Sequence, residues 1–162
     1  MAASPISAEV VQAFIQPVVD VVRSCVGLDT RVTKLDMTTQ IDPAPSLSVS
    51  IQVSGKLAGA VTVVLAADVA HLVARKLFSA TASEADDPTT CSEAVAELAN
   101  IVTGNATDKL LEAGYQVEIH PPHIHGASDR ELAERTLVVT LHTPAGEIKV
   151  LIDVRLSPPV AS

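Results

Sequence analysis

Aromatic residues are nearly absent from this chain of 162 residues, which contains no Trp, one Tyr and two Phe. Proteins that hold single-stranded nucleic acid on stacking platforms need aromatic side chains for the bases, so the composition argues against that class. The core must instead be built from Val, Leu, Ile and Ala. Hydrophobic residues make up 48% of the chain, which is enough for one core, and we expect a single domain spanning residues 1–162.

Positive charge and cysteine are also scarce. Lys and Arg number 11 against 19 Asp and Glu, and the net charge of -8 argues against binding to phosphate backbones or anionic lipid, leaving proteins or small ligands as partners. Cys25 and Cys91 match no zinc or redox spacing, so two reduced thiols are expected.

The longest nearly apolar stretch, 57–67, is about half of the ~20 residues that cross a bilayer, and the start lacks the features of a secretory signal. We therefore expect a cytoplasmic protein.

Hydrophobic periodicity and turn residues predict the order of the elements. The clearest signal is the apolar and polar alternation in 46–54, followed by a turn at Ser54-Gly55-Lys56 and a returning strand at 59–65. The other expected elements are a helix from Ser7 to Gly27, a strand at 32–37, a helix at 67–78, a helix ending near Ala113-Gly114, and strands at 117–120, 136–142 and 147–156. Loops are expected at 42–45 and 81–90, and 128–134 is interpreted as a surface excursion or a short helix. This order predicts an α+β fold, a mostly antiparallel sheet flanked by three main helices, with one covered face and one wetter face.

The third of these helices carries the only two Asn residues of the chain, in the segment EAVAELANIVTGN at 93–105. At ~100° per residue, one stripe of the helix carries polar residues and a glycine, with Ile101 and Leu111 beside it, and the opposite side is apolar. The stripe consists of Glu93, Glu97, Asn100, Gly104 and Asp108. Asn is a mediocre helix former, and such local conflicts tend to mark function. Gly104 lacks a side chain, so the backbone of a partner could approach closely there.

Two structural interpretations compete with a functional one. Glu93 follows Thr90 by three residues and could complete a capping box at the start of the helix. Glu97 and Asn100 could be ordinary solvated residues on an exposed face. Spacing alone does not decide between these interpretations and a binding or catalytic role.

Glu97 and Asn100, followed by Gly104-Asn105, resemble the helix motif of the CheC/CheX/FliY phosphatases, which has Asp or Ser, three residues, Glu, two residues, and Asn. The stretch from Gly114 to Gly126, which contains a proline pair, resembles the family's next strand with its proline and nearby glycine. The order of elements extends the resemblance over most of the chain, and a single copy of the motif favours the CheX branch. Glu93 departs from the pattern, because the family has Asp or Ser at that position.

The resemblance implies a phosphatase that acts on the aspartyl phosphate of a CheY-type response regulator. It implies that Asn100 orients the attacking water, that Glu97 contacts the lysine of the regulator's own site, and that Glu93, Ile101 and Gly104 contact the partner. Mg2+ and the phosphorylated aspartate would belong to the regulator, so we expect this chain to bind no metal or cofactor of its own. A homodimer through sheet edges is expected from CheX relatives.

Two other classes of function stay open at this point. The motif helix could dock a response regulator or a flagellar-switch protein without hydrolysis, as a non-catalytic adaptor. Alternatively, His120, His123 and His125, with His142 on a neighbouring strand, could bind a metal or ligand, since side chains two apart on a strand share a face. The histidines lack a specific ligand signature, which weighs against this second class.

Overall fold

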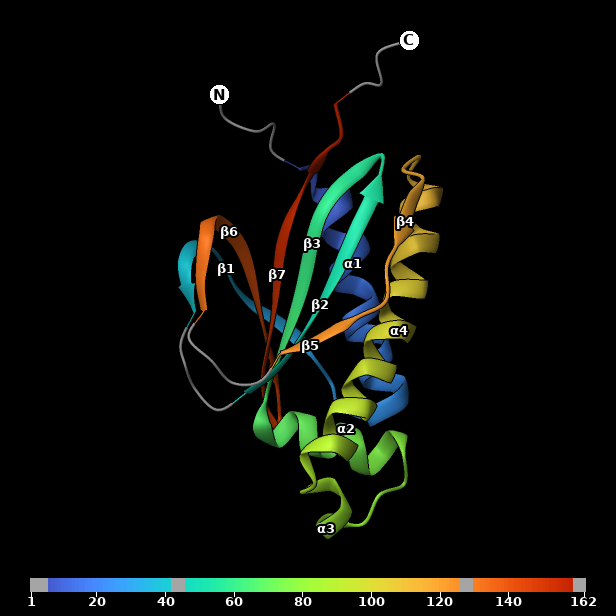
Figure 1. The fold of residues 1–162 in the computed structure, drawn as a ribbon, viewed down its shortest axis with the longest axis vertical. Coiled ribbons are helices and arrows are strands. Elements are labelled where there is room, and N and C mark those ends of the chain that lie inside the picture. The colour runs from blue at the N-terminus through green and yellow to red at the C-terminus, as the bar shows by residue number, and fades with distance from the viewer. Residues whose placement is uncertain (1–5, 42–45, 126–129, 159–162) are drawn as a thin grey trace.

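The computed structural model describes residues 6–41, 46–125 and 130–158, so the loop expected at 42–45 lies outside the described residues. Its elements are, in chain order, α1 (Ala8–Val21), η1 (Val22–Val26), β1 (Arg31–Ile41), β2 (Ser46–Gly55), β3 (Leu57–Ala66), α2 (Ala67–Leu77), α3 (Ala82–Ala85), α4 (Pro88–Glu112), β4 (Val117–Ile119), β5 (His123–His125), β6 (Arg130–Thr143) and β7 (Gly146–Leu156) (Figure 1). The seven strands form one antiparallel sheet in the order β1-β6-β7-β3-β2-β4, and β5 also pairs with β2. The predicted α+β class and the antiparallel sheet are confirmed.

The first helix begins and ends where the sequence predicts. The Ser7 hydroxyl accepts a hydrogen bond from the Val10 backbone N–H at 3.3 Å, which satisfies one of the free donors of the first turn. The last turn widens into the π-helical segment η1, and Gly27 ends it in the left-handed region with φ 78°. Pro17 lies inside α1 without ending it.

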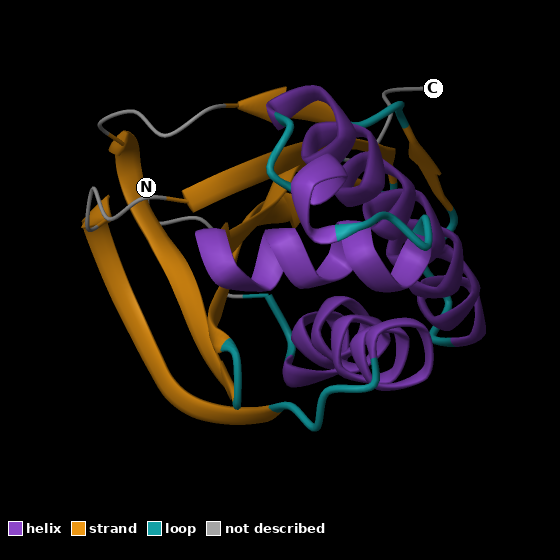
Figure 2. Ribbon diagram, turned by 90° about the horizontal axis from the view of Figure 1, so that it is seen from below, coloured by secondary structure: helices purple, strands orange, loops and turns teal. Residues whose placement is uncertain are grey.

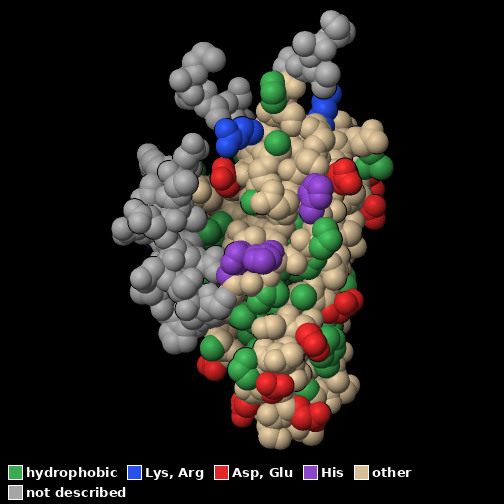
Figure 3. Space-filling view, in the orientation of Figure 1, with side chains coloured by type: hydrophobic (Ala, Val, Ile, Leu, Met, Phe, Trp, Pro, Cys, Tyr) green, Lys and Arg blue, Asp and Glu red, His purple; other side chains and the backbone are tan. Residues whose placement is uncertain are grey.

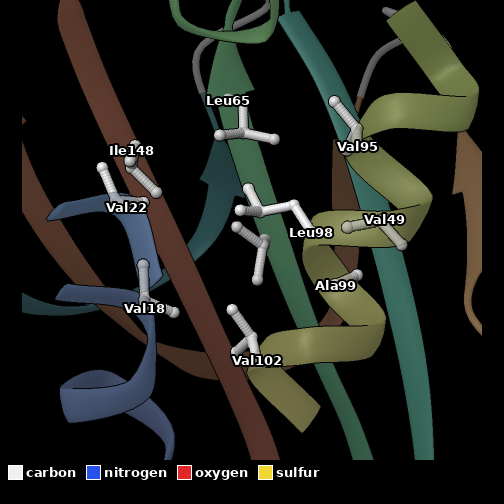
Figure 4. Close-up of a pocket in the computed structure, with 10 residues that line it drawn as sticks. Val18, Val22, Val49, Leu65, Val95, Leu98, Ala99, Val102 and Ile148 are labelled. Atoms are coloured by element: carbon white, nitrogen blue, oxygen red, sulfur yellow. The ribbon is translucent and has the colours of Figure 1, made fainter. Parts of the chain in front are cut away.

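The helices gather on one face of the sheet, where they bury the main core (Figure 2). Apolar side chains of α1, α4 and the strands close around a cavity of about 10 Å³ (Figure 4). Its lining residues are Val18, Val22, Val49, Val63, Leu65, Val95, Leu98, Ala99, Val102 and Ile148. A cavity of this size cannot hold a ligand. Its apolar lining offers no hydrogen-bond partner to a water molecule. This cavity is therefore part of the packed core and offers no binding site.

The outer face of the sheet is wetter, as predicted, but not throughout. Ser50 of β2 and Thr62 of β3 share a hydrogen bond of 3.0 Å there. Val64, Val138 and Leu151 form a second, smaller buried cluster. Among the described helices, none combines the length and the apolar character of a membrane span.

Two predictions about local structure are wrong. Residues 81–90 are not a simple loop, because they contain α3 and the start of α4. Residues 130–134 belong to β6 and form no helix, since β6 is held there by pairing with the distal part of β1; residues 128–129 lie outside the described part of the chain.

The capping box also lies at a different position from the one considered at Thr90 and Glu93. It is formed by Thr81 and Glu84 of α3, with hydrogen bonds of 3.2 Å from the Glu84 N–H to the Thr81 hydroxyl and 3.0 Å from the Thr81 N–H to Glu84 Oε1. The Thr81 N–H lowers the pKa of the Glu84 carboxyl. Helix α4 begins earlier than predicted, with Asp87 as its cap, because proline fits the first position of a helix. Glu93 is thus freed from a capping role.

Gly59 holds β3 close to β7. Its φ is 145°, and a Cβ atom there would overlap the Asp153 carbonyl oxygen and lie 2.9 Å from Val154 Cα. We expect Gly59→Ala to lower the free energy of unfolding by about 2–4 kcal/mol, since both the backbone strain and the contact with the neighbouring strand are unfavourable. Urea denaturation measures this change. A loss below about 1 kcal/mol would show that the two strands separate at little cost.

Candidate functional site

Helix α4 presents two distinct sides, as its sequence predicts. The buried side packs against α1, α2 and the sheet, and includes Val95, Leu98, Ala99, Val102, Ala106 and Leu110. The polar stripe faces outward, with Glu93, Glu97, Asn100, Gly104 and Asp108 all exposed. The helix is therefore fixed from behind while the stripe is open to a partner.

The functional groups of the stripe are free to bind another molecule. Within the described residues, no hydrogen bond or ion pair holds the side chain of Glu93, Glu97 or Asn100. Glu97 and Asn100 are three residues apart on one helix, which places their Cβ atoms about 5–6 Å from each other. A carboxylate and a carboxamide are thus presented side by side on a rigid support.

Thr103 is a residue near this pair that the sequence analysis did not single out. Its hydroxyl donates to the Asn100 backbone carbonyl at 3.1 Å, and the Thr107 hydroxyl donates to the Thr103 carbonyl at 2.7 Å. A Thr three residues after Asn100, and a second Thr four residues after the first, are the signal for such back-bonding in a helix. The hydroxyl of Thr103 therefore serves the helix itself.

Gly104 leaves an open space in the middle of the stripe. A Cβ atom there would meet nothing within 4 Å beyond its own helix. Internal packing therefore does not require a glycine at this position. Ile101, beside it, is half-buried and packs against the core.

Cys91 lies near the start of the same helix, but it has the wrong properties for a nucleophile. Burial raises the pKa of its thiol, so little thiolate forms near neutral pH. The described part of the chain also contains no group of three or more His, Cys, Asp or Glu residues that could hold a metal ion. The chemistry that this surface offers is hydrogen bonding and charge.

The histidines do not assemble as one cluster. His123 and His125 share a face of β5, as predicted, with ring centroids 4.7 Å apart. His120 instead bonds to the Ser54 hydroxyl at 2.9 Å. His142 was expected on a neighbouring strand, and this is wrong, because it lies on β6 opposite Arg31 and Glu147. In the sheet, β7, β3 and β2 lie between β6 and β5.

Charge is unevenly distributed over the visible surface. Acidic side chains follow the side formed by α4 and the end near α2 and α3, whereas the visible Lys and Arg side chains lie toward the opposite end (Figure 3). The stripe of α4 itself carries three exposed carboxylates, those of Glu93, Glu97 and Asp108. Electrostatic complementarity favours a partner with basic groups at its contact surface.

Comparison with known proteins gives a family and a fold. The family described as "Chemotaxis phosphatase CheX" matches residues 47–145, which include the whole of α4. Comparison with curated proteins gives no match.

Three solved structures illustrate the similarity of fold. A CheC-like superfamily protein from Shewanella has 14% identity and a TM-score of 0.79 over 94% of this chain and 100% of its own. A chemotaxis protein CheX from Desulfovibrio desulfuricans has 17% identity and a TM-score of 0.77 over 92% and 99%. The CheX of a CheX–CheY–BeF3–Mg2+ complex from Borrelia burgdorferi has 22% identity and a TM-score of 0.73 over 90% and 97%.

Proposed function

The chain belongs to the chemotaxis phosphatase CheX family, and from this premise we propose that it accelerates the loss of phosphate from the aspartyl phosphate of a CheY-type response regulator. The observation that carries the proposal is the pair Glu97 and Asn100, exposed and without side-chain partners among the described residues. The similar CheX from Borrelia burgdorferi was solved in a complex with CheY, BeF3 and Mg2+, which supports a CheY-type partner.

Asn100 is proposed to orient the water that attacks phosphorus. An acyl phosphate is already reactive, so a catalyst that holds a water in line with the phosphorus need not supply a nucleophile of its own. A carboxamide carries both donors and an acceptor, so it can accept a hydrogen bond from the water and donate one to a phosphoryl oxygen.

Glu97 is proposed to position the partner. Its carboxylate would contact the lysine of the regulator's own site, and a charge-assisted hydrogen bond of this kind is stronger than a neutral one. Glu93, Ile101 and Gly104 would contribute further contacts along the same stripe. The Mg2+ ion and the phosphorylated aspartate would be supplied by the regulator, so this chain needs no cofactor of its own.

Phosphate release tests the proposal. A CheY-type receiver is kept phosphorylated by a small phosphodonor, and inorganic phosphate is followed with and without a small amount of this chain. The proposal predicts faster steady-state release when the chain is present. Binding of the receiver without faster release of phosphate would instead identify the chain as an adaptor. Glu93, which stands where the family has Asp or Ser, favours this alternative.

We further propose that the chain forms a homodimer through β1. This strand of 11 residues is an edge strand of the sheet. The unpaired backbone groups of an edge strand can pair with a strand of another chain. Its residues Val32, Leu35 and Met37 lie opposite Leu141, Val139 and Leu137 of β6, so they point to the helix side of the sheet. They are nevertheless 44%, 63% and 45% exposed, because the helices do not reach this edge (Figure 2).

The charges of β1 fit a second copy. Lys34 and Asp36 flank Leu35 and form an exposed ion pair of 3.7 Å within the strand. Antiparallel pairing centred on Leu35 would place Lys34 of each copy opposite Asp36 of the other. The same strand would thereby match itself in both apolar contact and charge.

Leu35→Lys tests this edge. We expect the dimer dissociation constant to rise at least about tenfold, because the change buries a charge at the centre of the pairing. Light scattering over a concentration series measures it, with Leu156→Lys on β7 as an exposed control. A wild-type chain that stays monomeric at high concentration would contradict the dimer, and an unchanged dimer in Leu35→Lys would place it on another surface.

A further inference from the structure

Leu111 is a large apolar side chain at the exposed end of the motif stripe. It is 60% exposed, although it lies within the last turn of α4. Eleven residues separate it from Asn100, so it lies only about 20° around the helix and about 16 Å along its axis from that residue. Leu111 and Asn100 therefore face the same way, at two points of one continuous surface.

The surface between these two points is open. Gly104 lies between them, and a Cβ atom there would meet nothing within 4 Å beyond its own helix. The exposed carboxylates Asp108 and Glu112 stand beside Leu111. Thr107, the other residue on the line from Asn100 to Leu111, is short and half-buried, so a partner domain that contacts Asn100 can also contact Leu111.

We propose that Leu111 is a second anchor for the same receiver that presents its phosphorylated aspartate to Asn100. This inference rests on the proposed function and adds a docking determinant outside the reacting groups. A small domain is about 30 Å across, so one receiver spans the distance between the two residues. The partner surface that fits Leu111 is an apolar patch bordered by Lys or Arg, which would pair with Asp108 and Glu112.

Other exposed apolar residues do not share this arrangement. Phe78 follows α2 and is 42% exposed, and Leu156 ends β7 and is 48% exposed, but neither lies on α4. Single exposed apolar residues are common on proteins and carry no meaning alone. What distinguishes Leu111 is its alignment with the catalytic candidate on one rigid helix.

The test separates docking from chemistry. Receiver binding is measured with a CheY-type receiver loaded with BeF3 and Mg2+, and turnover is measured with the phosphorylated receiver, for wild type, Leu111→Ala and the matched control Leu156→Ala. We expect Leu111→Ala to raise both the dissociation constant and the half-saturating receiver concentration about 5–20-fold, with the maximal rate unchanged, since alanine removes most of the apolar surface that the complex would bury. Leu156→Ala should match wild type in every measurement.

The outcomes distinguish the two proposals. If Leu111→Ala binds the receiver and turns it over as wild type does, Leu111 is not an anchor, and the phosphatase assignment is unaffected. Wild-type binding without turnover would overturn the phosphatase assignment, and the binding arm would still decide the role of Leu111. A loss of maximal rate without a change in binding would also contradict the anchor, and absence of binding to any receiver would overturn both proposals.

Discussion

Asn100→Ala is expected to abolish the acceleration of receiver dephosphorylation while leaving the protein folded. We expect the rate added by the chain to fall about 10²–10³-fold, the usual effect of removing one well-placed hydrogen-bonding group from a catalytic site. The free energy of unfolding should change by less than about 0.5 kcal/mol, because the side chain is exposed and alanine is a better helix former. Decay of the phosphorylated receiver and urea denaturation measure the two quantities.

Asn105 offers a matched control for this experiment. It is the only other asparagine of the chain, it is exposed on the same helix, and it lies about 140° around the axis from Asn100. Asn105→Ala should therefore keep full activity. Full activity of Asn100→Ala would rule out the proposed water-orienting role, whereas equal losses in both variants would indicate a general effect on the helix.

Substitution of Gly104 is expected to move stability and activity in opposite directions. Glycine inside a helix costs about 1 kcal/mol relative to alanine, and nothing near Gly104 in the structure obstructs a larger residue. Gly104→Ala and Gly104→Gln should therefore raise the free energy of unfolding, by about 0.5–1 kcal/mol. Gly104→Gln should lower the acceleration about 10–100-fold, because its side chain would occupy the space into which the partner's backbone fits.

Urea denaturation and receiver decay measure these two effects on the same samples. Lys76→Gln on α2 is a suitable control, since it also places glutamine at an exposed helical position, away from the stripe. An active Gly104→Gln variant would show that no partner approaches closely at this point. Lower stability in Gly104→Ala would mean that the glycine serves the helix itself.

The parts of this fold that follow from local patterns could be predicted. The alternation in β2 and β3 and the apolar face of α4 repeat with the periods of a strand and a helix, so sequence alone indicates which side is buried. The exposure of Glu97 and Asn100 follows from the same geometry. The family resemblance supplied their roles, which neither periodicity nor spacing contains.

The parts that depend on distant segments could not be predicted. Thr81 to Glu84 and Thr90 to Glu93 both have the spacing of a capping box, and only the docking of α3 and the early start of α4 decide between them. Residues 130–134 are strand because β1 pairs with them. Exposure of Leu35 depends on how far the helices reach across the sheet, and no single segment encodes that distance.

The most direct test of the central claim is the decay of a labelled, phosphorylated CheY-type receiver in the presence of far less than one chain per receiver. We predict that the decay rate rises in proportion to the amount of chain, with each molecule clearing many receivers, and that all phosphate is released as inorganic phosphate. A decay rate that stays at the receiver's own value, with a folded chain that binds the receiver, would contradict the assignment as a phosphatase.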